Sequence, residues 1–136
     1  MRIIVLKGPS NKGKTTTIDL VYEIILRHGG KSTDKQQIGN PIFKDFKDIV
    51  TNYKDKKIAF FSMGDYSNEL VNAINTYNKE KCDLLICALS TDTEIIKANA
   101  ELDNFKTIRI NKTAVSEQDI QCRANVMDSL IILGLV

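Results

Sequence analysis

The chain has 136 residues, a length that suits one compact domain with a sizeable hydrophobic core. Hydrophobic residues make up 43% of the chain and charged residues 26%, and the formal net charge of +2 is too small to argue for a nucleic-acid partner. No apolar run is long enough for a signal peptide or a membrane span. The three cysteines form no CxxC pair, which excludes the usual patterns of a disulfide framework or zinc site. We therefore expect a single cytoplasmic domain over residues 1–136.

The first third of the chain predicts a strand, a helix and a long loop. Residues 3–6 form a continuous aliphatic run followed by Gly-Pro, which is typical of a strand buried on both faces. Apolar residues then recur at helical spacing over residues 15–27, and Gly29 and Gly30 end this helix, with His28 as a C-terminal cap. Residues 31–44 are polar and predict a loop.

The remainder of the chain alternates between strand and helix patterns. Strands are predicted over residues 46–53, 58–62, 84–89 and 107–110, of which the last two are buried. Helices are predicted over residues 67–79, from a Ser90-Thr91-Asp92 cap to Ala100, and from a Ser116/Asp119 capping box onward. The first two of these strands flank a lysine-rich turn and predict a hairpin, with a helix over 44–53 as the alternative. This order predicts an α/β domain with a mostly parallel sheet, helices on both faces and one antiparallel hairpin strand.

One segment matches the pattern G-x-x-x-x-G-K-[ST] without a gap: Gly8-Pro9-Ser10-Asn11-Lys12-Gly13-Lys14-Thr15. It lies between the first predicted strand and the first helix, where glycines let successive N–H groups point inward and the helix N-terminus favours phosphate. We expect the loop and the following Thr16 to bind a polyphosphate, Lys14 to contact its β- and γ-phosphates, and the Thr15 hydroxyl to bind Mg²⁺. The alternative is a glycine-rich turn without a ligand.

This segment resembles the Walker A motif of P-loop NTPases. The resemblance implies a P-loop fold that binds a nucleoside triphosphate with Mg²⁺. Lys12 stands directly before Gly13 and not at the early loop position of the signature lysine in partitioning ATPases, which disfavours that subfamily.

The same resemblance implies a second carboxylate, the Walker B group, at the end of an apolar strand. The run over residues 58–62 ends without one, and Asp65 follows three residues later, with Ser62 as a supporting hydroxyl. We predict that Asp65 acts in catalysis and binds the metal. The alternative is that it caps the next helix, a position that Asp favours. The run over residues 84–89 is followed by another carboxylate, Asp92.

The motif order also resembles a reduced small GTPase, with degenerate DxxG and NKxD motifs. Phe61 stands where the DxxG aspartate would be, and Ala114 replaces the NKxD aspartate, which removes the carboxylate expected for guanine. Asn111 and Lys112 can line a less selective base pocket or form an ordinary strand-to-helix loop. Thr33, in the polar loop, can act as a sensor of the γ-phosphate.

The leading functional hypothesis is a Mg²⁺-dependent protein that binds a nucleoside triphosphate, with ATP expected, and hydrolyses it slowly. The chain has only four arginines and no arginine cluster, so the charge-neutralising set of a fast phosphoryl-transfer enzyme is incomplete. The alternatives are a small-molecule kinase with residues 31–44 as acceptor loop, and a non-catalytic module that responds to nucleotide. The apolar C-terminal helix and residues 131–136 favour a homodimer.

Overall fold

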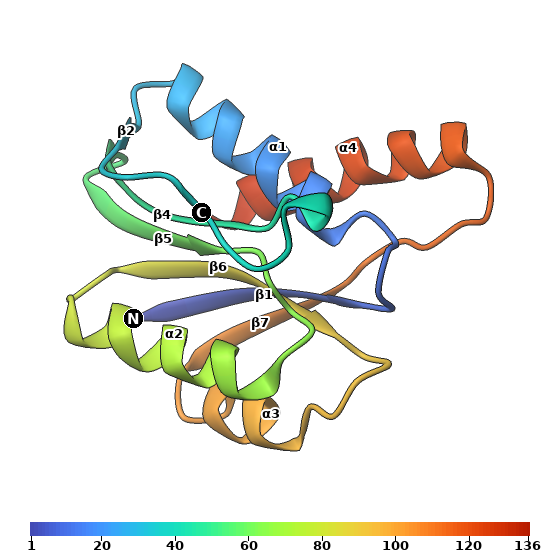
Figure 1. Ribbon diagram of the computed structural model, residues 1–136. Coiled ribbons are helices and arrows are strands. Elements are labelled where there is room, and N and C mark those ends of the chain that lie inside the picture. The colour runs from blue at the N-terminus through green and yellow to red at the C-terminus, as the bar shows by residue number, and fades with distance from the viewer.

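The computed structural model describes all residues from Met1 to Val136 as one α/β domain (Figure 1). Its strands are β1 (Arg2–Gly8), β2 (Lys31–Ser32), β3 (Gln36–Gln37), β4 (Phe46–Tyr53), β5 (Lys56–Phe61), β6 (Leu84–Ser90) and β7 (Lys106–Asn111). Its helices are α1 (Lys14–Arg27), the short 3₁₀ helix η1 (Pro41–Phe43), α2 (Ser67–Lys79), α3 (Ile96–Leu102) and α4 (Gln118–Leu135).

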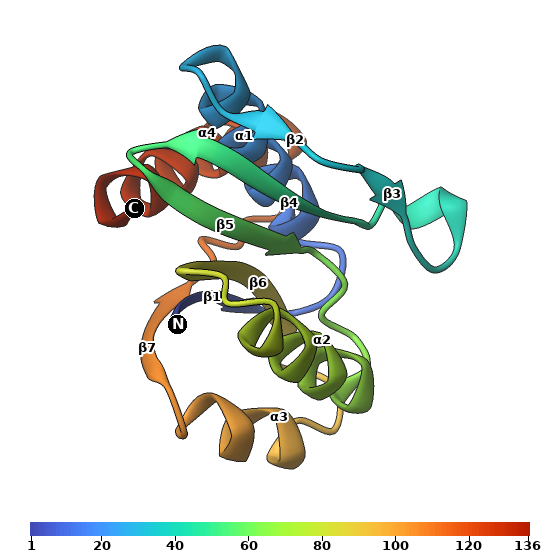
Figure 2. The ribbon, with the colours of Figure 1, turned by 90° about the vertical axis from the view of Figure 1, so that its left-hand side faces the viewer.

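The sheet is mixed and has the strand order β2-β4-β5-β6-β1-β7, with β3 paired to the same strand, β4, as β2. Strands β5, β6, β1 and β7 run parallel, whereas β4 runs antiparallel to β5 and to both short strands. The predicted hairpin is confirmed in β4 and β5. The prediction of a mostly parallel sheet is wrong, because residues 31–44 do not form a plain loop: their backbone supplies β2 and β3 along the outer edge of β4 (Figure 2).

Helices cover both faces of the sheet, as predicted: α1 and α4 lie on one face, α2 and α3 on the other (Figures 1 and 2). Alternation along β1 explains why its whole aliphatic run is buried. Ile4 and Leu6 join the core beneath α1 and α4, whereas Ile3 and Val5 join the core beneath α2 and α3. Because β5, β6, β1 and β7 are parallel, their carboxyl ends lie at the same edge of the sheet, where the loop after β1 begins.

Three predicted details differ from the structure. Strand β7 is an edge strand with no fully buried residue, because nothing pairs beyond it. Helix α3 begins at Ile96 and not at a Ser90–Asp92 cap, because the Asp92 side chain bonds to the loop after β1 instead. Helix α4 begins at Gln118, and no side-chain cap forms at its N-terminus, so the predicted capping box is wrong.

Helix α4 buries polar side chains beside apolar ones and leaves several large apolar side chains exposed. Asn125, Asp128 and Ser129 are buried. Its large exposed apolar residues are Ile120, Val126, Met127, Leu130 and Ile131. No helix of the domain has both the length and the apolar character needed to cross a bilayer. The predicted homodimer through this end of the chain stays a prediction.

Candidate phosphate-binding site

The loop over residues 8–13 leaves β1 and enters α1 through two glycines that no other residue can replace without strain. Gly13 has a φ of 88°, in the left-handed region, and a Cβ there would lie 2.3 Å from Oδ1 of Asn125. A Cβ on Gly8 would lie 2.8 Å from Cβ of Lys112. Hydrogen bonds from the amide of Lys112 to Lys7 and from the amide of Thr91 to Gly8 fix the end of β1 on both sides. The loop geometry is therefore set by its packing as well as by its own sequence.

The Lys14 side chain is buried within this loop. Its Nζ donates a hydrogen bond to the carbonyl oxygen of Pro9 at 2.7 Å. Burial lowers the pKa of Lys14, and the nearby carboxylates of Asp65, Asp92 and Asp45 oppose that effect. The Lys14 ammonium group is thus held at the centre of the loop with three carboxylates near it, where an anionic ligand would compete for it.

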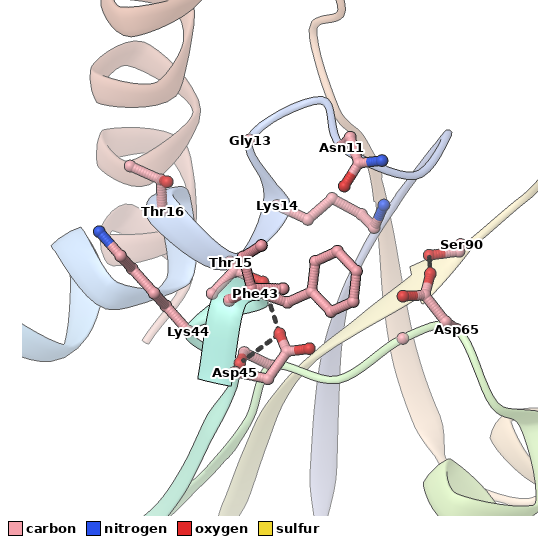
Figure 3. Close-up of a pocket in the computed structure, with 13 residues that line it drawn as sticks. Asn11, Gly13, Lys14, Thr15, Thr16, Phe43, Lys44, Asp45, Asp65 and Ser90 are labelled. Carbon is pink, nitrogen blue, oxygen red and sulfur yellow. Dashed lines mark hydrogen bonds between the residues drawn. The ribbon is translucent and has the colours of Figure 1, made fainter. Parts of the chain in front are cut away.

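Thr15 meets a carboxylate that the sequence did not single out, Asp45. Thr15 Oγ1 donates to Oδ1 of Asp45 at 2.7 Å, and Ser62 Oγ donates to the same oxygen at 3.1 Å (Figure 3). Asp45 is 6% exposed, and burial raises its pKa, an effect that the two hydroxyl donors oppose. Asp45 directly precedes β4, and the antiparallel pairing with β5 brings that strand's start next to Ser62. The only sequence signal was a carboxylate directly before the first apolar residue of a predicted hairpin.

The predicted Asp65 lies at the other side of the loop, near Ser10. Asp65 Oδ1 accepts hydrogen bonds from the hydroxyl of Ser10, at 3.0 Å, and from that of Ser90. The chain reaches this position because residue 64 is glycine: a Cβ there would lie 2.8 to 2.9 Å from backbone atoms of β6. The alternative role of Asp65 as a helix cap is wrong, because the N-cap of α2 is Tyr66 and no side-chain cap bond forms. Asp65 therefore faces the loop.

Asp92 also contacts Ser10. Its carboxylate oxygens both lie 3.2 Å from the Ser10 backbone nitrogen, and Oδ1 lies 2.9 Å from the Ser10 hydroxyl. These hydrogen bonds, the hydroxyl first, lower the pKa of Asp92. Three aspartates from three segments thus converge on the loop, with Asp45 at Thr15 and the other two at Ser10.

A cavity of about 320 Å³ opens between the loop and η1 (Figure 3). Loop and α1 residues Asn11, Lys14, Thr15 and the exposed Thr16 form one wall. The facing walls carry carboxylates and two exposed apolar side chains: Asp45, Asp65, Ile42 and Phe43. Its volume is at the lower end of the range usual for small-molecule sites.

The predicted base-pocket residues lie apart from this cavity. Lys112 is buried, and its Nζ pairs with Oδ2 of Asp128 at 2.7 Å, so its ammonium group is already engaged. Asn111 is exposed at the end of β7. Thr33, the predicted phosphate sensor, donates instead to the carbonyl oxygen of Ile49 at 2.8 Å. The role of Lys112 in the structure is to pack against Gly8 behind the loop.

Comparisons of the chain with protein-family models, with curated proteins and with solved structures found no match.

Proposed function

We propose that this domain binds a nucleoside triphosphate, with ATP expected, together with Mg²⁺, and hydrolyses it slowly. The observation that carries the proposal is the unbroken G-x-x-x-x-G-K-[ST] segment at a strand-to-helix turn, with the Lys14 ammonium group held inside the loop. The loop amides and the N-terminus of α1 suit an anionic phosphate chain, and Lys14 suits its β- and γ-phosphates.

The residues around Thr15 fit Mg²⁺. A hydroxyl and a carboxylate oxygen lie 2.7 Å apart on Thr15 and Asp45, and oxygen donors are the ligands that Mg²⁺ prefers. We assign these two residues as the protein's contribution to the metal site. Asp65, which the sequence predicted for this role, is the second candidate carboxylate. The ion would neutralise charge on the phosphates.

In the proposed reaction a water oxygen attacks the γ-phosphorus and the bond from that phosphorus to the β–γ bridging oxygen breaks. The products are the nucleoside diphosphate and inorganic phosphate. We assign to Asp65, which lies at the cavity wall, the roles of orienting the water and accepting its proton. None of the four arginines lines the cavity. We expect slow turnover, because an arginine finger contributes about 10³- to 10⁵-fold in comparable enzymes.

A small-molecule kinase is the second candidate, favoured by the apolar side chains of Ile42 and Phe43 at the cavity wall opposite Lys14. In that reaction an acceptor hydroxyl would replace water at the γ-phosphorus. Two observations would favour the kinase over hydrolysis: release of nucleoside diphosphate that rises only when a hydroxyl-bearing compound is added, and detection of the phosphorylated form of that compound.

Thermal unfolding with ATP, GTP, CTP or UTP, each with and without Mg²⁺, tests the binding proposal. A ligand that binds only the folded state stabilises it by about 2.7 kcal/mol at one hundred times its Kd. We expect ATP with Mg²⁺ to raise the unfolding temperature most. Unchanged unfolding temperatures with all four nucleotides would contradict the proposal.

Lys14→Ala tests the site itself. We expect this variant to lose the thermal shift and phosphate release, because it removes the cation at the centre of the loop. Lys79→Ala is the matched control, since Lys79 is exposed at the end of α2 and lines no part of the cavity. Equal phosphate release by Lys14→Ala and Lys79→Ala would place the active site elsewhere.

A further inference from the structure

Ser10 is held by a carboxylate through both of its polar groups. Asp92 lies 3.2 Å from the Ser10 backbone nitrogen and 2.9 Å from its hydroxyl. The amide belongs to the loop whose N–H groups are expected to bind phosphate, so in this arrangement a side chain of the same protein uses it. A carboxylate is itself an anion, and it satisfies this amide as a phosphate oxygen would.

We propose that Asp92 is a specificity residue for the phosphate chain: it competes with the terminal phosphate for Ser10 and so weakens binding of a triphosphate relative to a diphosphate. This inference rests on the proposed nucleotide site. It goes further by assigning the residue that sets the preference between substrate and product.

The proposal assigns the terminal phosphate, and not the others, to Ser10. The hydroxyl of Ser10 lies beside Asp65 and Asp92, at the carboxyl ends of β5 and β6, whereas Thr16 lies at the start of α1. Lys14 is expected to contact the β- and γ-phosphates between these two regions. In the proposed binding mode the first phosphate lies at Thr16 and the last at Ser10, so a diphosphate ends before Ser10.

The two carboxylates differ in how they hold Ser10. One hydroxyl proton cannot serve Asp65 and Asp92 together, although both accept within 3.0 Å. Only Asp92 also takes the backbone N–H, and Asp65 has a second donor in Ser90. Asp92 is exposed on the segment over residues 91–95, which joins β6 to α3. It is therefore the carboxylate that can turn outward when a phosphate arrives.

The test is Asp92→Asn, which removes the charge while its side-chain oxygen can still accept from Ser10. The Kd values of ATP and ADP are measured by titration calorimetry, with Mg²⁺ and with EDTA. We expect the affinity for ATP to rise about tenfold, a factor that corresponds to about 1.4 kcal/mol, and the affinity for ADP to change less than about twofold. The rise should appear with and without the metal, because the competition is between two anions.

Asp55→Asn is the control for the same loss of charge, since Asp55 lies exposed in the β4–β5 turn at the opposite end of these strands. We expect it to leave both Kd values unchanged. A fall in ATP affinity in Asp92→Asn, with Mg²⁺ alone or in both conditions, would overturn the proposal, as would an equal change for ATP and ADP. Failure of the unsubstituted protein to bind either nucleotide would instead contradict the proposed function.

Discussion

At the scale of single residues, the ion pair between Lys112 and Asp128 supports the loop over residues 8–13. The Lys112 side chain is 0% exposed, and Asp128 also accepts hydrogen bonds from the amide and hydroxyl of Thr113. Lys112 in turn packs against Gly8. A buried pair of this kind contributes little over an apolar pair, but removing one partner leaves the other charge buried alone. The segment after β7 and helix α4 are thus joined behind the loop over residues 8–13.

We predict that Asp128→Ala lowers the free energy of unfolding by about 3–5 kcal/mol, because it leaves the Lys112 ammonium group buried without its partner. Urea denaturation followed by circular dichroism measures this. Asp103→Ala is the matched control, because Asp103 pairs with Arg109 at the surface, and we expect a loss of at most about 1 kcal/mol. Equal losses in the two variants would show that the Lys112 charge finds another partner.

The pH dependence of stability gives a second test of the same carboxylate. Burial alone would raise the pKa of Asp128, but hydrogen bonds from Lys112 and from the amide and hydroxyl of Thr113 outweigh burial and hold that pKa below its ordinary value. A lowered pKa in the folded state means that the stabilisation is fully present above the ordinary pKa of about 3.9 and is lost as the pH falls below it. We predict that the stability difference between the unsubstituted protein and Asp128→Asn shrinks below about pH 4. A constant difference from pH 7 to pH 3 would contradict the assignment.

At the scale of elements, we expect Gly→Ala to have opposite effects on stability at two positions, Gly64 and Gly134. A Cβ on Gly64 would meet the backbone of Ala88 and Leu89, which cannot move without disturbing β6. A Cβ on Gly134, inside α4, would meet nothing within 4 Å. We predict that Gly64→Ala destabilises the protein by about 1–3 kcal/mol, whereas Gly134→Ala stabilises it by up to about 1 kcal/mol. Thermal unfolding of both variants measures this. A stabilised Gly64→Ala variant would mean that the backbone at residue 64 does not pack against β6 as closely as the structure shows.

Elements with an apolar pattern of their own are predictable from the sequence. Strand β1, helices α1 and α2 and the β4–β5 hairpin follow the spacing of their apolar residues. The short strands β2 and β3 are polar and exposed, and their pairing depends on the edge that β4 offers, so residues 31–44 look like a loop. The capping residues failed as signals for α3 and α4. For α3 the reason is that a carboxyl group can also bind a distant partner: Asp92 bonds to Ser10, which is 82 positions away.

Some residues of the candidate site can likewise be predicted from the sequence, and others cannot. The loop is a contiguous motif, so Lys14 and Thr15 could be found from the sequence. Asp45 could not, because its contact with Thr15 exists only once β4 pairs antiparallel with β5. The motif at Asn111 and Lys112 predicts either a base pocket or an ordinary loop. Neither reading predicts the burial of Lys112, which depends on Asp128, sixteen positions further along the chain. Side chains that meet through strand pairing or helix packing are thus the part of the site that linear spacing misses.

At the scale of the whole molecule, α4 separates two surfaces with different roles. Its inner face carries Asn125 against Gly13 and Asp128 against Lys112, so it supports the loop. Its outer face carries apolar side chains that the domain leaves uncovered. A second copy of the chain is the occupant we predict, since a two-fold contact buries the same stripe on both copies.

The apolar residues on this outer face recur at spacings of three, four and seven, which suits packing against another helix. We predict a dimer whose population rises with concentration, because one helix face buries less than the roughly 800 Å² per partner of a standard stable interface. Sedimentation velocity over a concentration series measures it. Met127→Glu should give a monomer at every concentration. Its unfolding temperature should match that of the unsubstituted protein at concentrations where both are monomeric, since Met127 is 61% exposed. Ile96→Glu, at an exposed position on α3, should leave the dimer intact. A monomer mass for the unsubstituted protein throughout the series would exclude a second copy as the partner of α4.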